Sequence, residues 1–180
     1  MHNYIAFLRA INVGGHNIKM DYLKLLFKKM GFSNAETFIA SGNVIFESNE
    51  EDRLKIENTI EKYLLKSLGY NTAAFLRTSE ELKHIIKYKA FPPVKYDEAA
   101  ANNIGFIKNT LNREQVKILQ SLETEIDDFS SHKTEVYWLC KKRQNQSTFS
   151  GNLFEKKLKA PVTFRGIRTL QKLLARYIEN

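Results

Sequence analysis

The chain has 180 residues, of which 43% are hydrophobic and 12% aromatic, and it carries a formal net charge of +8. This composition supports a buried core in one large or two small domains and excludes a membrane span, because no apolar run approaches the roughly 20 residues needed. The N-terminus lacks a signal-peptide pattern and Cys140 is the only cysteine, so a cytoplasmic protein without an intrachain disulfide is expected.

The first half of the chain predicts the order strand, helix, two strands, helix, strand. β-prone apolar runs indicate the strands, and apolar residues at helical spacing indicate the helices. The strands are expected at residues 4–11, 37–40, 44–47 and 73–77, and the helices at 20–30 and 56–68. A further helix is expected just after residue 78.

Three polar residues are placed to begin helices. Ser48 and Thr78 are each followed, three residues later, by a glutamate, and this spacing is that of a capping box. Asn112 is a single candidate cap in the second half of the chain. Each predicts a helix that begins at the next residue or soon after it.

The second half repeats the order of elements. Phe91-Pro92-Pro93 ends the preceding helix, so residues 91–101 are expected to be a linker. Strands are expected at 104–107, within 128–140 and at 162–165, and helices after 112, near 153–158 and over 170–178. The predicted fold is α+β, with two ferredoxin-like βαββαβ repeats, each followed by a helix, over residues 1–90 and 102–180. The matching order suggests a duplication, although chance agreement is the alternative.

The loop after the first strand is the leading candidate site. It contains Asn12, Gly14, Gly15 and His16 and follows Arg9. Glycines let backbone N–H groups converge, the next helix adds its positive end, and an arginine could clamp an anion. This predicts a site for a small anionic, phosphate-type ligand and a positive φ at one glycine or both. A plain tight turn is the alternative.

Four further residues are secondary candidates. Ser41 and Asn43 sit in a predicted hairpin turn and could donate hydrogen bonds to a ligand, although a turn alone explains them. We expect this turn to lie at the opposite end of the sheet from the Arg9 loop. Arg77 and Arg165 are expected at equivalent positions of the two halves, where each meets an anion or pairs with an acid.

The last third of the chain is strongly basic. Residues 141–176 hold ten lysines and arginines and one acid, Glu155. Such a stretch attracts polyanions, so a nonspecific nucleic-acid binder is an alternative function, with Tyr137 and Trp138 as possible stacking residues. Solubility alone also explains the charge.

The sequence contains no motif that indicates a metal or cofactor site. The histidines are scattered, so no metal site and no cofactor are expected. Cys140 precedes Lys141, which could lower its thiol pKa, but a lone cysteine in an apolar strand is usually a packing residue. A small enzyme whose catalytic groups converge only in three dimensions is a third possibility. The oligomeric state is left open.

Two segments resemble a known bacterial family. Leu8-Arg9-Ala10-Ile11-Asn12-Val13-Gly14-Gly15 and Ser41-Gly42-Asn43-Val44-Ile45-Phe46 are similar to the opening motifs of the domain of unknown function DUF1697. The resemblance extends along the whole chain to Thr163-Phe164-Arg165-Gly166-Ile167. It departs from the family at Ala10, where glycine is usual, and after Arg165, where Asn-Trp is usual. The resemblance implies an α+β fold of two related halves and no particular activity.

Overall fold

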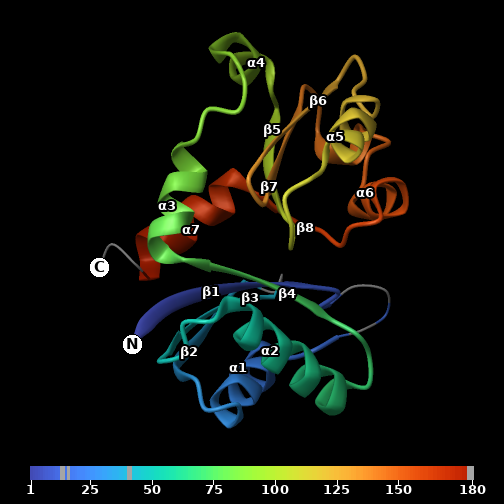
Figure 1. Cartoon of the computed structure of the whole chain (residues 1–180). Coiled ribbons are helices and arrows are strands. Elements are labelled where there is room, and N and C mark those ends of the chain that lie inside the picture. The colour runs from blue at the N-terminus through green and yellow to red at the C-terminus, as the bar shows by residue number, and fades with distance from the viewer. Residues whose placement is uncertain (13–14, 16, 40–41, 178–180) are drawn as a thin grey trace. The chain divides into compact units, whose positions relative to one another are not determined.

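The computed structural model describes residues 1–12, 15, 17–39 and 42–177. In this part of the chain, seven α-helices and two four-stranded antiparallel sheets form a mixed α+β fold (Figure 1). The chain divides into two compact units, which we call unit 1 (the described residues of Met1–Lys83 and Leu173–Asn180) and unit 2 (His84–Lys172). None of the helices formed by the described residues has the length and apolar character that a bilayer crossing requires.

Unit 1 is a sheet with two helices on one face. Its elements in chain order are β1 (His2–Arg9), α1 (Met20–Lys29), β2 (Ser33–Phe38), β3 (Asn43–Ser48), α2 (Arg53–Leu68), β4 (Ala73–Thr78) and the start of α3 (Ser79–Lys87). The strands lie in the order β2-β3-β1-β4. Helices α1 and α2 cover the same face (Figure 1), where Leu23, Phe27, Phe46 and Ile60 form the centre of the core.

Unit 2 repeats this strand order. It contains the end of α3, α4 (Pro93–Glu98), β5 (Ala101–Phe106), α5 (Arg113–Gln120), β6 (Asp127–His132), β7 (Glu135–Cys140), the 3₁₀ turn η1 (Gln144–Gln146), α6 (Gly151–Leu158), β8 (Thr163–Gly166) and the first part of α7 (Ile167–Tyr177). The order β6-β7-β5-β8 matches that of unit 1 position by position. Its core gathers Trp138, Phe129, Phe149 and Phe154.

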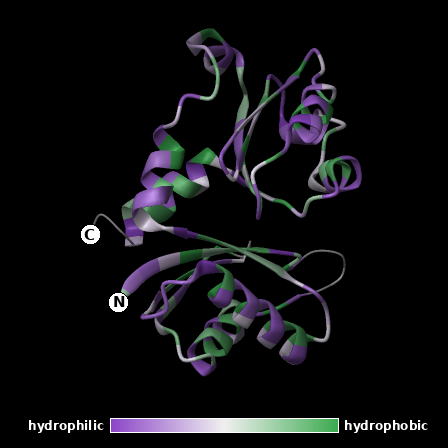
Figure 2. Ribbon diagram, viewed as in Figure 1, coloured by the Kyte–Doolittle hydropathy of each residue, from purple (hydrophilic) through white to green (hydrophobic). Residues whose placement is uncertain are grey.

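The longer helices of unit 1 bury one face each. Figure 2 shows hydrophobic and hydrophilic residues interspersed along α1 and α2. In α1 the buried residues are Leu23, Leu26 and Phe27, at the three- and four-residue spacing of one helical face. The apolar periodicity of the sequence therefore predicts both where these helices run and which side faces the sheet.

Two of the three predicted helix starts are confirmed. Thr78 and Glu81 form the expected capping box, because each side chain accepts the backbone N–H of the other. Asn112 caps α5 in the same way. The box predicted at Ser48 is wrong, because Asp52 caps α2 and accepts a first-turn N–H with its carboxylate.

The expected linker holds ordered structure. Residues 91–101 include α4 and the first residue of β5, because a proline at the start of a helix needs no hydrogen-bond donor and favours the helical φ. The division between the units falls after Lys83, inside α3, and the end of α7 belongs to unit 1. These limits differ from the sequence-based halves of 1–90 and 102–180.

Candidate functional site

The two motif loops of unit 1 lie against each other. Strand β1 pairs with β3 in antiparallel register, with Phe7 opposite Asn43, so the end of β1 meets the start of β3. Leu8 donates its backbone N–H to the carbonyl of Gly42 at 2.8 Å. A Cβ added to Gly42 would lie 3.0 Å from the Cβ of Ile11. The expectation that these loops occupy opposite ends of the sheet is therefore wrong, because antiparallel pairing of β1 with β3 brings them to one end.

Both loops hold left-handed backbone. The φ angles are 64° at Ala10, 56° at Asn12, 88° at Gly15, 54° at Ile39 and 72° at Gly42. Positive φ is unfavourable for residues with a Cβ and most of all for a β-branched residue such as isoleucine. Such strain persists only where the surroundings enforce it, and it gathers at functional sites. Gly15 confirms that at least one glycine of the first loop has positive φ.

The asparagines of the two loops hold the backbone in place. The Oδ1 of Asn12 accepts the N–H of Ile18 at 2.5 Å, which ties the loop to the approach to α1. Asn43 is fully buried, and its Nδ2 donates to the carbonyl of Phe38 at 3.1 Å across the β2–β3 turn. These bonds assign both side chains a structural role. Gly14, His16 and Ser41, also predicted as site residues, lie outside the described residues.

A hollow of about 470 Å³ opens beside the first loop, at the start of α1. Its lining includes Gly15, Asn17, Ile18, Lys19, Tyr22, Ser67, Leu68 and Tyr70. We call it the α1 hollow. The N-cap residue of α1 is Lys19, and among the described residues its side chain makes no capping hydrogen bond. Burial raises the pKa of the Tyr70 phenol, which therefore remains a hydrogen-bond donor at neutral pH.

Arg9 is not among the described residues that line the α1 hollow. Leu8 packs in the core under the helices, and neighbouring residues in a strand face opposite sides of the sheet. Arg9 therefore faces away from α1. Lys19 is instead the cation that the structure places at the hollow.

Arg77 and Arg165 are equivalent, as predicted. Arg77 pairs with Ile5 across β4 and β1, and Arg165 pairs with Ile104 across β8 and β5. Each donates from Nη1 to the carbonyl of the preceding residue, at 2.6 Å in unit 1 and 2.9 Å in unit 2. Both are buried, and burial lowers the pKa of Arg165 to about 10. Neither guanidinium is presented on the surface for a soluble ligand.

Part of the positive charge of residues 141–176 is buried or paired in the folded protein. Arg165 is buried, and Lys141 forms a 2.9 Å ion pair with Glu98. Tyr137 and Trp138 are both buried, and the Trp138 indole donates to Asp127 at 2.8 Å. Base stacking on these rings is therefore excluded, because their faces pack inside the protein.

Cys140 is a packing residue. It is buried in the core of unit 2, and burial raises the pKa of its thiol, opposite to the lowering that a neighbouring lysine would cause. Within the described ranges, no three histidine, cysteine or acidic residues are grouped as metal ligands would be.

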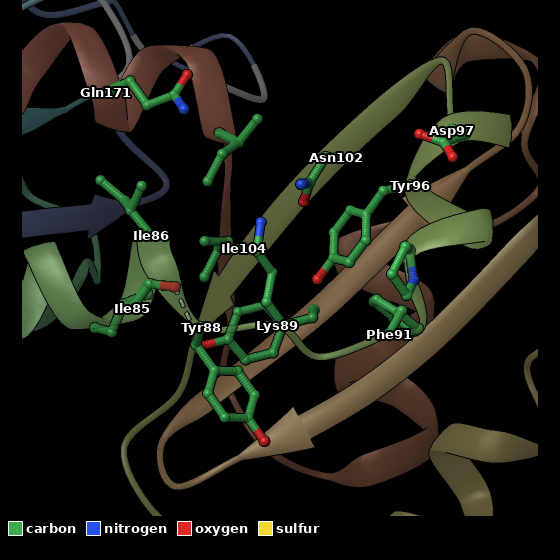
Figure 3. A pocket seen from close by; sticks show the side chains of 13 residues that line it. Ile85, Ile86, Tyr88, Lys89, Phe91, Tyr96, Asp97, Asn102, Ile104 and Gln171 are labelled. Atoms are coloured by element: carbon green, nitrogen blue, oxygen red, sulfur yellow. Dashed lines mark hydrogen bonds between the residues drawn. The ribbon is translucent and has the colours of Figure 1, made fainter.

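Unit 2 contains a cavity of about 450 Å³ that sequence analysis missed (Figure 3). We call it the unit 2 cavity. Its walls come from the end of α3, from α4, β5, β7 and α7, and from the segment between α3 and α4. Apolar and aromatic side chains make up most of the lining, and the polar ones are Tyr88, Lys89, Tyr96, Asp97, Asn102 and Gln171. Several of its lining residues fall in residues 91–101, which the sequence analysis interpreted as a linker.

The family model for proteins of unknown function DUF1697 matches residues 1–137. The chain belongs to this family. The match covers both motif loops of unit 1 and, in unit 2, extends into β7. Among curated proteins none matches the chain.

The fold of this chain is also seen in a solved structure, that of a conserved bacterial protein from Streptococcus pneumoniae. It is 22% identical to this chain, the alignment covers 97% of each chain, and the TM-score is 0.73. At this identity the likeness establishes a shared fold. The two converging loops are the opening motifs by which this chain resembles DUF1697, and Ala10 in the first of them has a φ of 64°.

Proposed function

We propose that the chain binds a small anionic ligand of the phosphate type at the α1 hollow of unit 1. The observation that carries this proposal is that the first motif loop, which has left-handed backbone at Ala10, Asn12 and Gly15, leads into a hollow at the start of α1 that Gly15 lines. Left-handed backbone at a residue with a Cβ, such as Ala10, is strained, and such strain gathers at functional sites.

The chemistry of the α1 hollow suits an anion. The helix macrodipole places partial positive charge at the start of α1, a helix of ten residues, where its first N–H groups lack intrahelical partners. Lys19 adds a full positive charge, and the hydroxyls of Ser67 and Tyr70 can donate hydrogen bonds. Lys19 itself makes no side-chain cap at this helix start, which is compatible with a ligand meeting the first-turn N–H groups.

A thermal-shift screen with phosphate-bearing metabolites tests the proposal. A ligand present at a hundred times its Kd adds about 2.7 kcal/mol to the free energy of unfolding, which produces a readily measured shift in Tm. The Lys19→Ala variant should lose affinity about tenfold or more, as expected for one charge-assisted hydrogen bond. Lys29→Ala, at the opposite end of the same helix, is the matched control and should bind as the unmodified protein does.

A variant of Arg9 distinguishes the α1 hollow from the loop site around Arg9 that the sequence predicted. If Lys19 and the helix start hold the ligand, Arg9→Gln should leave affinity nearly unchanged, because Arg9 faces the other side of the sheet. A tenfold loss in Arg9→Gln with none in Lys19→Ala would reject the α1 hollow. No Tm shift with any phosphate compound would reject the function itself.

We further propose that both units are ferredoxin-like repeats that arose by duplication, and that the protein acts in the cytoplasm. The common strand order supports the repeats, as does the matching bond from Arg77 and Arg165 to the preceding carbonyl. The single, buried cysteine fits a reducing compartment.

A further inference from the structure

The unit 2 cavity has the features of a site for an aromatic ligand. Its volume of about 450 Å³ lies in the range of small-molecule sites, and such sites are mostly apolar with a few convergent polar groups. Ile85, Ile104 and Ile167 provide apolar wall. All its lining residues belong to unit 2, and none belongs to the α1 hollow, so it would be a separate site.

Two tyrosine rings on the wall of the cavity are held in fixed positions. The Tyr88 ring stacks on His132, with centroids 4.2 Å apart and planes 13° apart, and also contacts Tyr137. The Tyr96 hydroxyl accepts the N–H of Ala90 at 3.0 Å. Tyr88 is nevertheless 38% exposed. Rings that are positioned in advance and still accessible can stack on a planar ligand at little entropic cost.

A cation stands beside these rings. The Nζ of Lys89 lies 5.3 Å from the centre of the Tyr96 ring, close enough for a cation–π contact. In the described part of the chain, Lys89 forms no ion pair with a carboxylate. Its ammonium group is therefore available to an anionic group of a ligand whose ring lies in the cavity.

Three polar side chains complete the recognition chemistry. Figure 3 shows Asn102 from β5 and Gln171 from α7 at the cavity, together with Asp97 from α4. A carboxamide offers a donor and an acceptor, the pattern that matches the edge of a nucleobase. A carboxylate accepts hydrogen bonds from sugar hydroxyls or from an exocyclic amine.

We propose that the unit 2 cavity binds a nucleoside monophosphate. The base occupies the apolar slot against the tyrosine rings and pairs its edge with Asn102. The phosphate meets Lys89. An apolar acid without a heterocyclic edge would leave the Asn102 carboxamide unpaired, and inorganic phosphate alone would leave the apolar surface unfilled.

Calorimetric titration of the full chain with AMP, GMP, CMP and UMP tests the proposal. At least one should bind, and its nucleoside should bind more weakly. Lys89→Ala should weaken the nucleotide about tenfold or more and leave the nucleoside unchanged, because the lost contact is to the phosphate. Lys87→Ala, a neighbouring exposed lysine outside the cavity, is the matched control and should change neither.

Two further variants test the stacking surface and the polar contact to the edge of the base. Tyr88→Ala should weaken nucleotide and nucleoside alike by about tenfold, because it removes a stacking surface. If the Tm shows that this variant does not fold, Asn102→Ala replaces it, with the same expected pattern. Binding of none of the four nucleotides would overturn the proposal. Binding that is lost in Lys19→Ala but kept in Lys89→Ala and Tyr88→Ala would overturn it too, because the ligand would then sit in the α1 hollow.

Discussion

Ala10 follows the last residue of β1 with a left-handed backbone, at φ 64°. An L-residue in this region costs roughly 1–2 kcal/mol because its Cβ crowds the carbonyl that follows. Glycine, which has no Cβ, would avoid that contact. The alanine of this chain therefore carries strain that the remainder of the loop must offset.

Replacing Ala10 with glycine should raise the free energy of unfolding by about 1 kcal/mol, because relief of the left-handed strain exceeds the entropic cost of glycine in the unfolded chain. Urea unfolding measures the change. Ala175→Gly, on the exposed side of α7, is the control and should lower stability by about 1 kcal/mol, as glycine does inside a helix. Opposite signs are expected, and a loss of stability in both variants would show that Ala10 is unstrained.

At the scale of elements, glutamates on one helix of each unit accept backbone N–H groups in or just before an edge strand of the sheet. Strand β4 lies at the edge of its sheet, where outward N–H groups would otherwise be unpaired. Glu57 and Glu61 of α2 accept the N–H groups of Leu76 and Ala74, at 2.9 and 2.8 Å. In unit 2, Glu155 of α6 accepts an N–H just before β8 in a similar way. Helix and edge strand are thus joined by side-chain to backbone bonds.

Glu57 is almost fully buried, so its bond to the Leu76 N–H should matter for stability. Glu57→Leu leaves that N–H without an acceptor and should cost roughly 1–3 kcal/mol in the free energy of unfolding. Glu57→Gln retains an accepting oxygen and should cost clearly less. Equal losses in the two variants, measured by urea unfolding, would mean that the charge of Glu57 matters and the bond does not.

The start of α3 should respond to pH through Glu81. Burial by itself raises the pKa of this carboxyl, but hydrogen bonds from Arg53 and from the Thr78 N–H outweigh burial and leave the pKa below its usual value of 4.5. A lowered pKa in the folded state contributes stability that is present above the unfolded pKa and is lost as the pH falls through the folded one. The urea midpoint should therefore fall below pH 4.5 more steeply in the unmodified protein than in Glu81→Gln. Parallel curves would contradict this.

Local signals predicted elements better than they predicted sites. Apolar periodicity gave the order of strands and helices, and caps such as Asn112 and Thr78 fixed helix starts, because both depend on neighbouring residues. The convergence of the two motif loops depends on which strands pair, and periodicity does not encode pairing. The unit 2 cavity was missed because Pro93 was interpreted as a helix breaker and not as the first residue of α4.

At the scale of the whole molecule, charge is the property that made nucleic-acid binding an alternative function. The net charge is +8, but some of the basic residues in the stretch 141–176 are not available to a polyanion in the folded protein. Arg165 is buried and Lys141 is paired with Glu98. Lys142 and Arg143 remain exposed at the end of β7. Aromatic stacking there is excluded by the burial of Tyr137 and Trp138.

These charges predict weak nucleic-acid binding of purely electrostatic origin. Affinity for a single-stranded oligonucleotide should fall steeply between about 50 and 200 mM salt, because the binding is driven by released counterions. Replacing Lys142 and Arg143 together by glutamate should weaken the affinity for the oligonucleotide further at low salt. Lys89→Ala in the unit 2 cavity should have a much smaller effect, because it removes a single charge from an aromatic pocket. Fluorescence anisotropy at a series of salt concentrations measures both effects. Affinity that is insensitive to salt, or that depends on the base sequence, would contradict the electrostatic account. Such binding would require a surface that contacts the bases. The strand beside the basic segment does not offer one, because Tyr137 and Trp138 are buried.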